Sequence, residues 1–257
     1  MNKRNIVSLL TALLFPLTMT AQDKPTAYIA TDLVTHYMWR GQNLGNVCLQ
    51  PTMAALWKGF RVSIEGSVGF THDDYEEIDL HLDYNYKGFG IGIADFWGES
   101  TGDPRYFRFG NSSGHMLEAN IGYECKYGSL FAYTTFAGND FRIDGKRAYS
   151  TFIELAIPFE ALGLSWDFHA GFTPFESAGI QYEEVSIDAQ GQETTVVKNE
   201  YFYAKNFNCN MLSLRATWEL EFGKFSLPVF VEFHTNPAAE DARLFVGFTV
   251  SSEHILK

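Results

Sequence analysis

Three pairs of a carboxylate and a histidine, each two residues apart, are the first candidates for chemistry in this chain. They are Asp79/His81, Asp167/His169 and Glu232/His234. Residues i and i+2 of a strand point to the same face, so each carboxylate can orient its imidazole for metal binding or acid–base work. The sequence contains no HExxH or similar dense ligand motif. We therefore predict hydrogen-bonded structural pairs, with no metal site and no cofactor.

A second candidate is the segment with Ser112, Ser113 and His115. A hydrolase needs a nucleophile, a histidine and an orienting group held together. The run Asn111-Ser112-Ser113-Gly114 has the composition of a flexible loop. We predict no catalytic residue here, and a lipid-modifying hydrolase stays as an alternative function.

The elements that position these residues are strands. Between Phe60 and Phe70, apolar and polar residues alternate, and this period of two indicates a strand with one apolar face and one polar face. The pattern predicts twelve strands, most of them about nine to eleven residues long, the length that crosses a membrane when tilted. They are 29–39, 49–57, 60–70, 77–86, 89–96, 117–125, 130–136, 149–157, 164–172, 211–220, 225–233 and 243–250.

The connections between these segments alternate in length. Short turns such as Lys58-Gly59 and Lys87-Gly88 alternate with long polar loops near 98–115, 138–147 and 173–203, and the last of these contains its own predicted hairpin. This rhythm predicts an all-β fold, a closed antiparallel transmembrane up-and-down barrel of about twelve strands with both termini at the short-turn end. A secreted β-sandwich is the alternative.

Several residues test this prediction. Pro51, Pro158 and Pro228 lie within or directly at the end of predicted strands, where bulges or strand ends must accommodate them. In the seventh strand, Phe131 and Tyr133 compete with Leu130 and Phe136 for the outer face.

Aromatic side chains near strand ends predict interfacial girdles. The predicted girdle residues are Tyr37, Trp39, Trp57, Phe60, Phe70, Tyr84, Tyr86, Phe89, Trp97, Tyr123, Trp218 and Phe225.

The first residues have the pattern of a secretory signal peptide. Lys3 and Arg4 precede an apolar stretch and the small residues before Gln22. We predict a cleaved signal peptide at 1–21 and a barrel domain at 22–257.

The formal net charge of −12 and the lack of a basic cluster exclude a nucleic-acid partner. The three cysteines, at positions 48, 125 and 209, can form one disulfide at most.

Short motifs in the first third of the predicted barrel add a resemblance. They are Tyr37-Met38-Trp39-Arg40-Gly41, Gln50-Pro51 and Glu77-Ile78-Asp79-Leu80 followed by Tyr84 and Gly88. With these motifs the chain resembles the TorF-like porin family of bacterial outer-membrane β-barrels. The resemblance implies an outer-membrane barrel of poorly defined activity and carries over no catalytic residues.

The polar phase of the strands would line the barrel interior. Its carboxylates outnumber its arginines, which favours cations over anions. Gly90, Gly92 and Gly171 would leave space, whereas Phe152, Phe230 and Phe245 would fill it, so we predict a narrow lumen. The predicted lumen residues are Glu65, Asp79, His81, Asp83, Glu118, Glu154, Asp167, His169, Glu232, Arg61 and Arg215, with Asp32, Glu77, Glu124, Glu219 and Arg243 in the same phase.

The predicted function is therefore that of an outer-membrane porin with a narrow, cation-preferring path for small solutes. Its predicted partners are outer-membrane lipid, small solutes and the barrel-assembly machinery. A non-conducting structural or surface-interaction barrel is a further alternative, because the lumen carboxylates can also pair with arginines, tyrosines and histidines in a rigid network.

Overall fold

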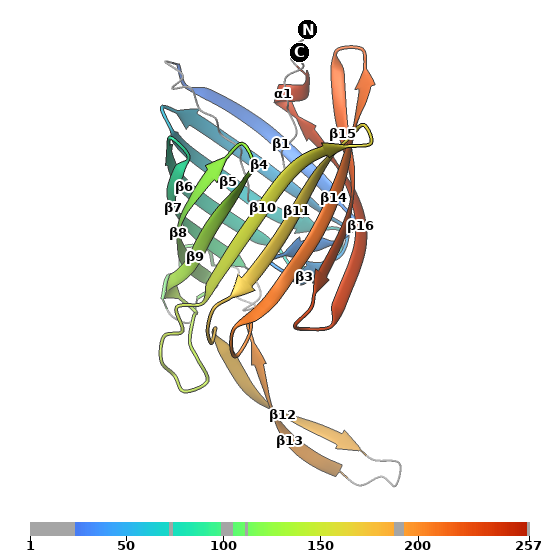
Figure 1. Cartoon of the computed structure of the whole chain (residues 1–257). Helices are drawn as coiled ribbons and strands as arrows, with labels where there is room; N and C mark the ends of the chain where they lie inside the picture. Colours follow the sequence, from blue (N-terminus) through green and yellow to red (C-terminus); the bar gives the residue numbers. More distant parts are fainter. Residues whose placement is uncertain (1–23, 72–73, 99–104, 111–112, 188–192, 256–257) are drawn as a thin grey trace.

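The computed structural model describes residues 24–71, 74–98, 105–110, 113–187 and 193–255. Within these ranges, twelve antiparallel strands close into a barrel in the order β1-β16-β15-β14-β11-β10-β9-β8-β7-β6-β5-β4 (Figure 1). The predicted fold class and strand number are confirmed. The signal peptide predicted at 1–21 lies outside the described residues. No helix of the described chain is long and apolar enough to cross a membrane.

Each barrel strand matches one predicted segment, with shifted ends. The barrel strands are β1 (Thr26–Val34), β4 (Cys48–Trp57), β5 (Phe60–Gly69), β6 (Glu77–Tyr86), β7 (Phe89–Gly98), β8 (His115–Cys125), β9 (Gly128–Gly138), β10 (Thr151–Ala161), β11 (Leu164–Thr173), β14 (Asn208–Phe222), β15 (Phe225–Asn236) and β16 (Asp241–Ser251). The remaining elements are the hairpins β2 (Tyr37–Trp39) with β3 (Gln42–Gly45) and β12 (Gly179–Ile187) with β13 (Glu193–Tyr201), and α1 (Ser252–Ile255).

The alternating apolar and polar residues form an outer and an inner face of the strands, as predicted. On β5, Val62 and Ile64 are about half exposed on the outside, whereas Arg61 and Ser63 are buried on the inside. The short turns join neighbouring strands at one end of the barrel, beside both termini, and the long loops lie at the other end (Figure 1). Lys58-Gly59 and Lys87-Gly88 have positive φ at both positions, the geometry of a type I′ turn, which matches the twist of a hairpin.

Each of the three prolines, which have no N–H to donate, lies at a gap or beyond the end of the pairing with one neighbouring strand. Pro51 pairs with Thr31 of β1, but on the β5 side the pairing skips from Leu49↔Val68 to Thr52↔Glu65. Pro158 lies beyond the last pair between β9 and β10, and Pro228 lies beyond the last pair between β15 and β16. A closed barrel therefore accommodates proline at local gaps in its ladders.

The first predicted strand, 29–39, is wrong at its second half. β1 ends at Val34, which pairs directly with Cys48 of β4, and the residues between them turn into the barrel instead of extending the wall. We call residues 35–47 the plug hairpin. Its turn, Arg40-Gly41, has the same doubly positive φ as the short turns of the wall. Tyr37 and Trp39 are consequently buried inside the barrel, so their predicted place in the lipid-facing girdle is wrong.

Most of the other predicted girdle residues do face outward. Trp57, Phe89 and Trp218 are among the large exposed aromatics, in contrast to Trp97, which is only 7% exposed because Tyr106 covers it with ring centroids 5.5 Å apart. In β9, Leu130 and Phe136 face outward and Tyr133 is buried inside, which settles the open phase of that strand. The hairpin predicted within 173–203 is confirmed as β12 and β13, which extend beyond the barrel (Figure 1).

We predict that Gly41→Ala destabilises the barrel far more than Gly145→Ala. Both glycines have positive φ, at 85° and 80°, so the backbone strain of alanine is matched. A Cβ at Gly41 would lie 1.9 Å from the backbone oxygen of Asn210, whereas a Cβ at Gly145 meets nothing within 4 Å. The measurement is urea unfolding of the refolded protein in lipid vesicles. Equal losses of unfolding free energy would contradict the seating of the plug hairpin against β14.

Candidate functional site

The plug hairpin fills the long-loop half of the lumen. Tyr37 and Trp39 pack in one cluster of buried apolar side chains that the barrel wall and the segment after β13 also supply. Phe152, Phe230 and Phe245 belong to this cluster and are 0–4% exposed, as predicted for residues that fill the lumen. The cluster members are Val34, Tyr37, Trp39, Cys48, Tyr133, Phe152, Tyr203, Met211, Phe230 and Phe245.

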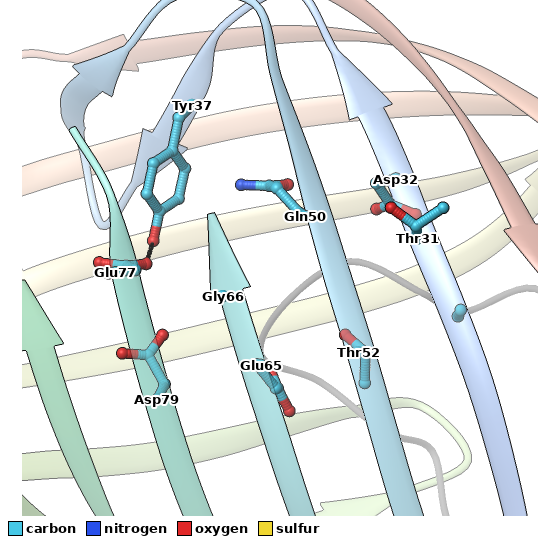
Figure 2. A pocket seen from close by; sticks show the side chains of 10 residues that line it. Thr31, Asp32, Tyr37, Gln50, Thr52, Glu65, Gly66, Glu77 and Asp79 are labelled. Carbon is cyan, nitrogen blue, oxygen red and sulfur yellow. Dashed lines mark hydrogen bonds between the residues drawn. The ribbon is translucent and has the colours of Figure 1, made fainter. Parts of the chain in front are cut away.

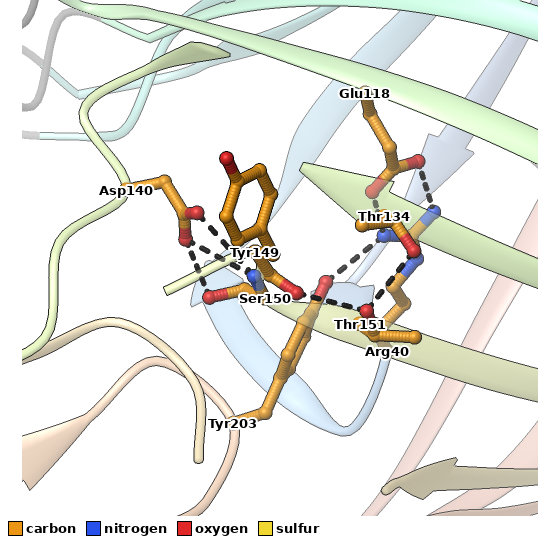
Figure 3. A network of polar contacts seen from close by, with 8 residues as sticks. All are labelled: Arg40, Glu118, Thr134, Asp140, Tyr149, Ser150, Thr151 and Tyr203. Atoms are coloured by element: carbon orange, nitrogen blue, oxygen red, sulfur yellow. Dashed lines mark hydrogen bonds and ion pairs between the residues drawn. The ribbon is translucent and has the colours of Figure 1, made fainter. Parts of the chain in front are cut away.

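Arg40, at the tip of the plug hairpin, reaches the opposite wall (Figure 3). Its two terminal nitrogens donate to the two carboxylate oxygens of Glu118 on β8, at 2.5 and 2.7 Å. One of them also donates to the Tyr203 hydroxyl at 2.9 Å. The guanidinium carbon lies 4.5 Å from the ring centre of Trp39 and 4.3 Å from that of Tyr133. The bidentate pair and the two aromatic faces form a fitted binding site for this guanidinium.

The environment of Arg40 makes its pairing obligatory. Its side chain is 1% exposed and that of Glu118 is 3% exposed, so neither charge is solvated by water. A buried charge without its partner is strongly destabilising. Burial also raises the pKa of Tyr203, which keeps its phenol protonated beside Glu118 and Arg40. The plug hairpin is therefore held by a charge pair as well as by apolar packing.

Side-chain amides of the wall hydrogen bond to backbone carbonyls of the plug hairpin and of the segment after β13. The Asn236 side-chain amide donates to the Gly41 carbonyl at 3.1 Å, and the Asn210 amide donates to the Tyr203 carbonyl at 2.9 Å. Beside this network, Asp140 accepts hydrogen bonds from the hydroxyl and the backbone N–H of Ser150 (Figure 3). The segment after β13, the plug hairpin and the loop after β9 thus close one end of the lumen together.

The predicted lumen residues lie on the inner face, and several form ion pairs. Arg61 contacts Glu65 at 2.5 Å and Asp83 at 3.5 Å. Arg215 contacts Glu232 at 2.5 Å. Arg243 is on the predicted inward phase, opposite His234, but it lies at the rim beside Asp241, with its side chain 43% exposed.

The three carboxylate–histidine pairs differ in their contacts. Glu232 and His234 hydrogen bond to each other at 3.0 Å, as predicted for a structural pair. His169 bonds to Glu154 of the neighbouring strand at 2.7 Å. The ring of His81 packs edge-on against Phe96, with centroids 5.5 Å apart. Among the described residues, no group of three or more His, Cys, Asp or Glu side chains is arranged to hold a metal ion.

Below the plug hairpin, four carboxylates line one small cavity (Figure 2). Asp32 comes from β1, Glu65 from β5, and Glu77 and Asp79 from β6. The cavity has a volume of about 40 Å³, and Tyr37 of the plug hairpin forms part of its wall. The Tyr37 hydroxyl donates to Glu77. Buried negative charge and the underside of the plug hairpin therefore meet at one place.

Charge is unequally distributed over the whole inner face. At least eleven carboxylates lie on the inward phase of the described strands, and three arginines lie inside the barrel. The carboxylates include Asp32, Glu65, Glu77, Asp79, Asp83, Glu118, Glu124, Glu154, Asp167, Glu219 and Glu232, and the arginines are Arg40, Arg61 and Arg215. Asp83, Asp167 and Arg215, which lie farther toward the short-turn end, are only partly buried. The lumen is therefore acidic, and its charged side chains are less deeply buried toward the short turns.

The serine–histidine candidate does not have the contacts of a nucleophile and its base. His115 Nδ1 lies 2.9 Å from Asp95, and His115 Nε2 lies 2.5 Å from the Tyr106 carbonyl oxygen. The Ser113 hydroxyl donates to the Gly110 carbonyl at 2.7 Å and accepts from the His115 backbone N–H. Both imidazole nitrogens are thus directed at other partners. Ser112 lies outside the described residues.

Sequence reasoning missed Arg40, whose guanidinium binds Glu118 and Tyr203 inside the barrel. The signal for its position was present, because Arg40-Gly41 repeats the pattern of a basic residue before glycine seen in the turns Lys58-Gly59 and Lys87-Gly88. The cysteines of the described chain, Cys48, Cys125 and Cys209, are all free thiols. Cys48 is buried in the cluster under the plug hairpin, and Cys125 is exposed.

Comparisons with known proteins add two distant likenesses. No protein-family model and no curated protein matches the chain. A solved structure of Salmonella typhi OmpF in complex with daunomycin is similar at 9% identity with a TM-score of 0.34, and the match covers 88% of this chain and 97% of that one. BauA, the ferric preacinetobactin receptor of Acinetobacter baumannii, is similar at 13% identity with a TM-score of 0.19, over 92% of this chain and 43% of that one. The fold assignment rests on the strands and their register.

We predict that Arg40→Met lowers the unfolding free energy by about 3–5 kcal/mol, because it leaves Glu118 buried without its cation. The double variant Arg40→Met/Glu118→Gln should recover part of this loss, since no uncompensated charge is left. Arg142→Met is the matched control, because Arg142 pairs with Asp144 in an exposed loop and such pairs contribute little. Urea unfolding in detergent micelles measures all three. Similar losses for Arg40→Met and Arg142→Met would contradict the role of the buried pair.

Proposed function

We propose that this protein is an outer-membrane barrel that provides a narrow, cation-preferring path for small solutes, closed in this conformation by the plug hairpin. The observation that carries the proposal is the polarity of the barrel, which is apolar outside and acidic inside. The TorF-like resemblance is compatible with this function but stays a prediction.

The outer face supports a lipid environment. Val62, Ile91 and Leu130 are each more than half exposed on the outward phase of different strands. A soluble protein would leave a continuous apolar band of this kind in water, which is strongly unfavourable. A membrane barrel buries it in hydrocarbon, with polar residues turned to the lumen. On this account, outer-membrane lipid and the barrel-assembly machinery are partners of the folded and folding chain.

The inner face supports a preference for cations. Several carboxylates, among them Asp32 and Asp167, have no ion pair with an arginine within 4 Å in the described structure, so the lumen carries net negative charge. Low-dielectric walls focus this potential, which attracts cations and repels anions. The short turns would face the periplasm and the long loops the outside. The accessible, acidic half of the lumen would then open to the periplasm.

The plug hairpin supports a closed state that can be opened. It contributes no strand to the wall, because Val34 and Cys48 at its two ends already pair with each other. Removing or displacing it would therefore keep the order of the twelve strands, with loss of the hydrogen bonds between Thr35 and Val246 of β16. Because the hairpin lies inside a barrel whose strands already pair without it, it can act as a gate.

The membrane part of the proposal predicts that Ile93→Lys costs about 2–4 kcal/mol of unfolding free energy in lipid vesicles. Ile93 is 51% exposed at the middle of β7, where a lysine would enter hydrocarbon. Leu162→Lys is the control, because Leu162 is 92% exposed in a short turn at the position that lysine occupies in Lys58-Gly59 and Lys87-Gly88. If Ile93→Lys costs no more than this control, the outer face does not contact lipid.

The transport part predicts different single-channel currents for two loop deletions in a planar bilayer under a KCl gradient. Replacing residues 35–47 by Asn-Gly joins Val34 to Cys48 with a tight turn and should increase the conductance several-fold, with a reversal potential on the cation side. Replacing residues 180–200 by Asn-Gly shortens the β12–β13 hairpin outside the barrel and should leave the conductance of the full chain unchanged.

Two outcomes of the same experiment would contradict the proposal. The first is a 35–47 deletion that folds, judged by heat-modifiable gel migration, but stays electrically silent. The second is an open path with an anion-side reversal potential. The first result would favour a non-conducting structural barrel, and the second would refute the role of the lumen carboxylates.

A further inference from the structure

The cavity lined by Asp32, Glu65, Glu77 and Asp79 has the features of a binding site in its own right (Figure 2). We propose that it binds the ammonium group of a small, free primary amine. The inference builds on the proposed function, because it names the class of cation that this part of the lumen would accept. Binding itself needs no open path through the barrel.

The charge balance of the cavity favours a positively charged ligand. Four carboxylates line it, and its lining contains no lysine, arginine or histidine. Glu65 receives hydrogen bonds from Arg61 and Ser63, and Glu77 receives one from Tyr37. Arg61 therefore compensates Glu65, and Glu77 and Asp79 hydrogen bond to each other. Asp32 and this pair have no lysine or arginine within 4 Å among the described residues, so a cation is the complementary ligand.

One carboxylate oxygen in the cavity, Asp79 Oδ1, has no hydrogen-bond donor among the described residues. Asp79 is 6% exposed. Its carboxylate lines the cavity, near Glu77 and Glu65 (Figure 2). A buried carboxylate oxygen without a hydrogen bond is costly, and a ligand that donates to it removes that cost. The cavity thus lacks a donor at a specific atom.

The chemistry of the walls favours an ammonium group over a metal ion. Among the residues that the structure describes, no three of these side chains are arranged to hold a metal ion. An ammonium group instead donates three hydrogen bonds in different directions, and the lining offers carboxylate, hydroxyl and amide oxygens as acceptors, among them those of Asp79, Thr52 and Gln50.

The size of the cavity limits the ligand. Its volume of about 40 Å³ holds only a few atoms, since one water-sized group needs about 10–15 Å³. An ammonium group with one attached carbon fits this space, whereas a quaternary ammonium is bulkier and has no N–H to donate. A phosphate attached to the amine would meet the carboxylates with like charge. These differences define the probes of the test.

The test is isothermal titration of the folded, full-length barrel in detergent with methylammonium chloride, at constant KCl concentration. We expect one binding site per chain. Asp79→Asn should weaken the affinity by about tenfold or more, because it removes a charged acceptor of the ligand. Glu221→Gln, which removes the same charge from the exposed end of β14, should bind as the unchanged protein does. Tetramethylammonium and phosphoethanolamine should bind more weakly than methylammonium.

Heat-modifiable gel migration verifies that both variants are folded. Thermal unfolding of the unchanged protein, with and without methylammonium, gives a second readout that needs no variant, because a ligand of the folded state raises its melting temperature. The inference is overturned if methylammonium does not bind, if Asp79→Asn binds it equally well, or if tetramethylammonium or phosphoethanolamine binds as tightly. If methylammonium binds saturably to a barrel that conducts no ions, the proposed path is refuted and the binding site is supported. If the barrel conducts cations but does not bind methylammonium saturably, the binding site is refuted and the path is supported.

Discussion

The rest of the lumen depends on the burial of one positive charge, that of Arg40. A guanidinium removed from water must be paired, and here Glu118, Tyr203 and two aromatic rings surround it. Because Arg40 lies at the turn of the plug hairpin, satisfying its charge also draws Tyr37 and Trp39 into the barrel. The same placement brings Tyr37 over the carboxylate cavity. Closure of the lumen and the shape of the cavity are thus consequences of a single ion pair and its packing.

The barrel wall imposes a second, more general constraint. The outer phase of strands such as β5 is apolar, so the charged side chains of these strands are accommodated inside. Cross-strand pairs such as Arg61 with Asp83 and Arg215 with Glu232 neutralise part of this charge. The arginines are too few for the carboxylates, and the excess is concentrated beside β1, β5 and β6. An acidic interior follows from the composition of one phase of the sequence.

The sequence predicted the wall well and the lumen less well, for a physical reason. A strand with an apolar outer face and a polar inner face must alternate, so its period of two is visible in segments such as Phe60–Gly69. The plug hairpin lies inside the barrel, and its aromatic residues resemble those predicted for a girdle. Tyr37 and Trp39 continue the alternation of β1, and only the Arg40-Gly41 turn marks the change of direction. Trp97 was misassigned because a distant part of the following loop, Tyr106, covers it.

The central claim is that the plug hairpin occupies the lumen and covers the inner wall. Its most direct test uses two native cysteines, Cys48 under the hairpin and Cys125 in an exposed position. The measurement is the rate of modification of each thiol by a small, water-soluble methanethiosulfonate reagent, followed by mass spectrometry of the folded protein in vesicles. The account predicts fast modification of Cys125, slow modification of Cys48, and fast modification of Cys48 when residues 35–47 are replaced by Asn-Gly. Equally fast modification of both thiols in the unchanged protein would contradict it.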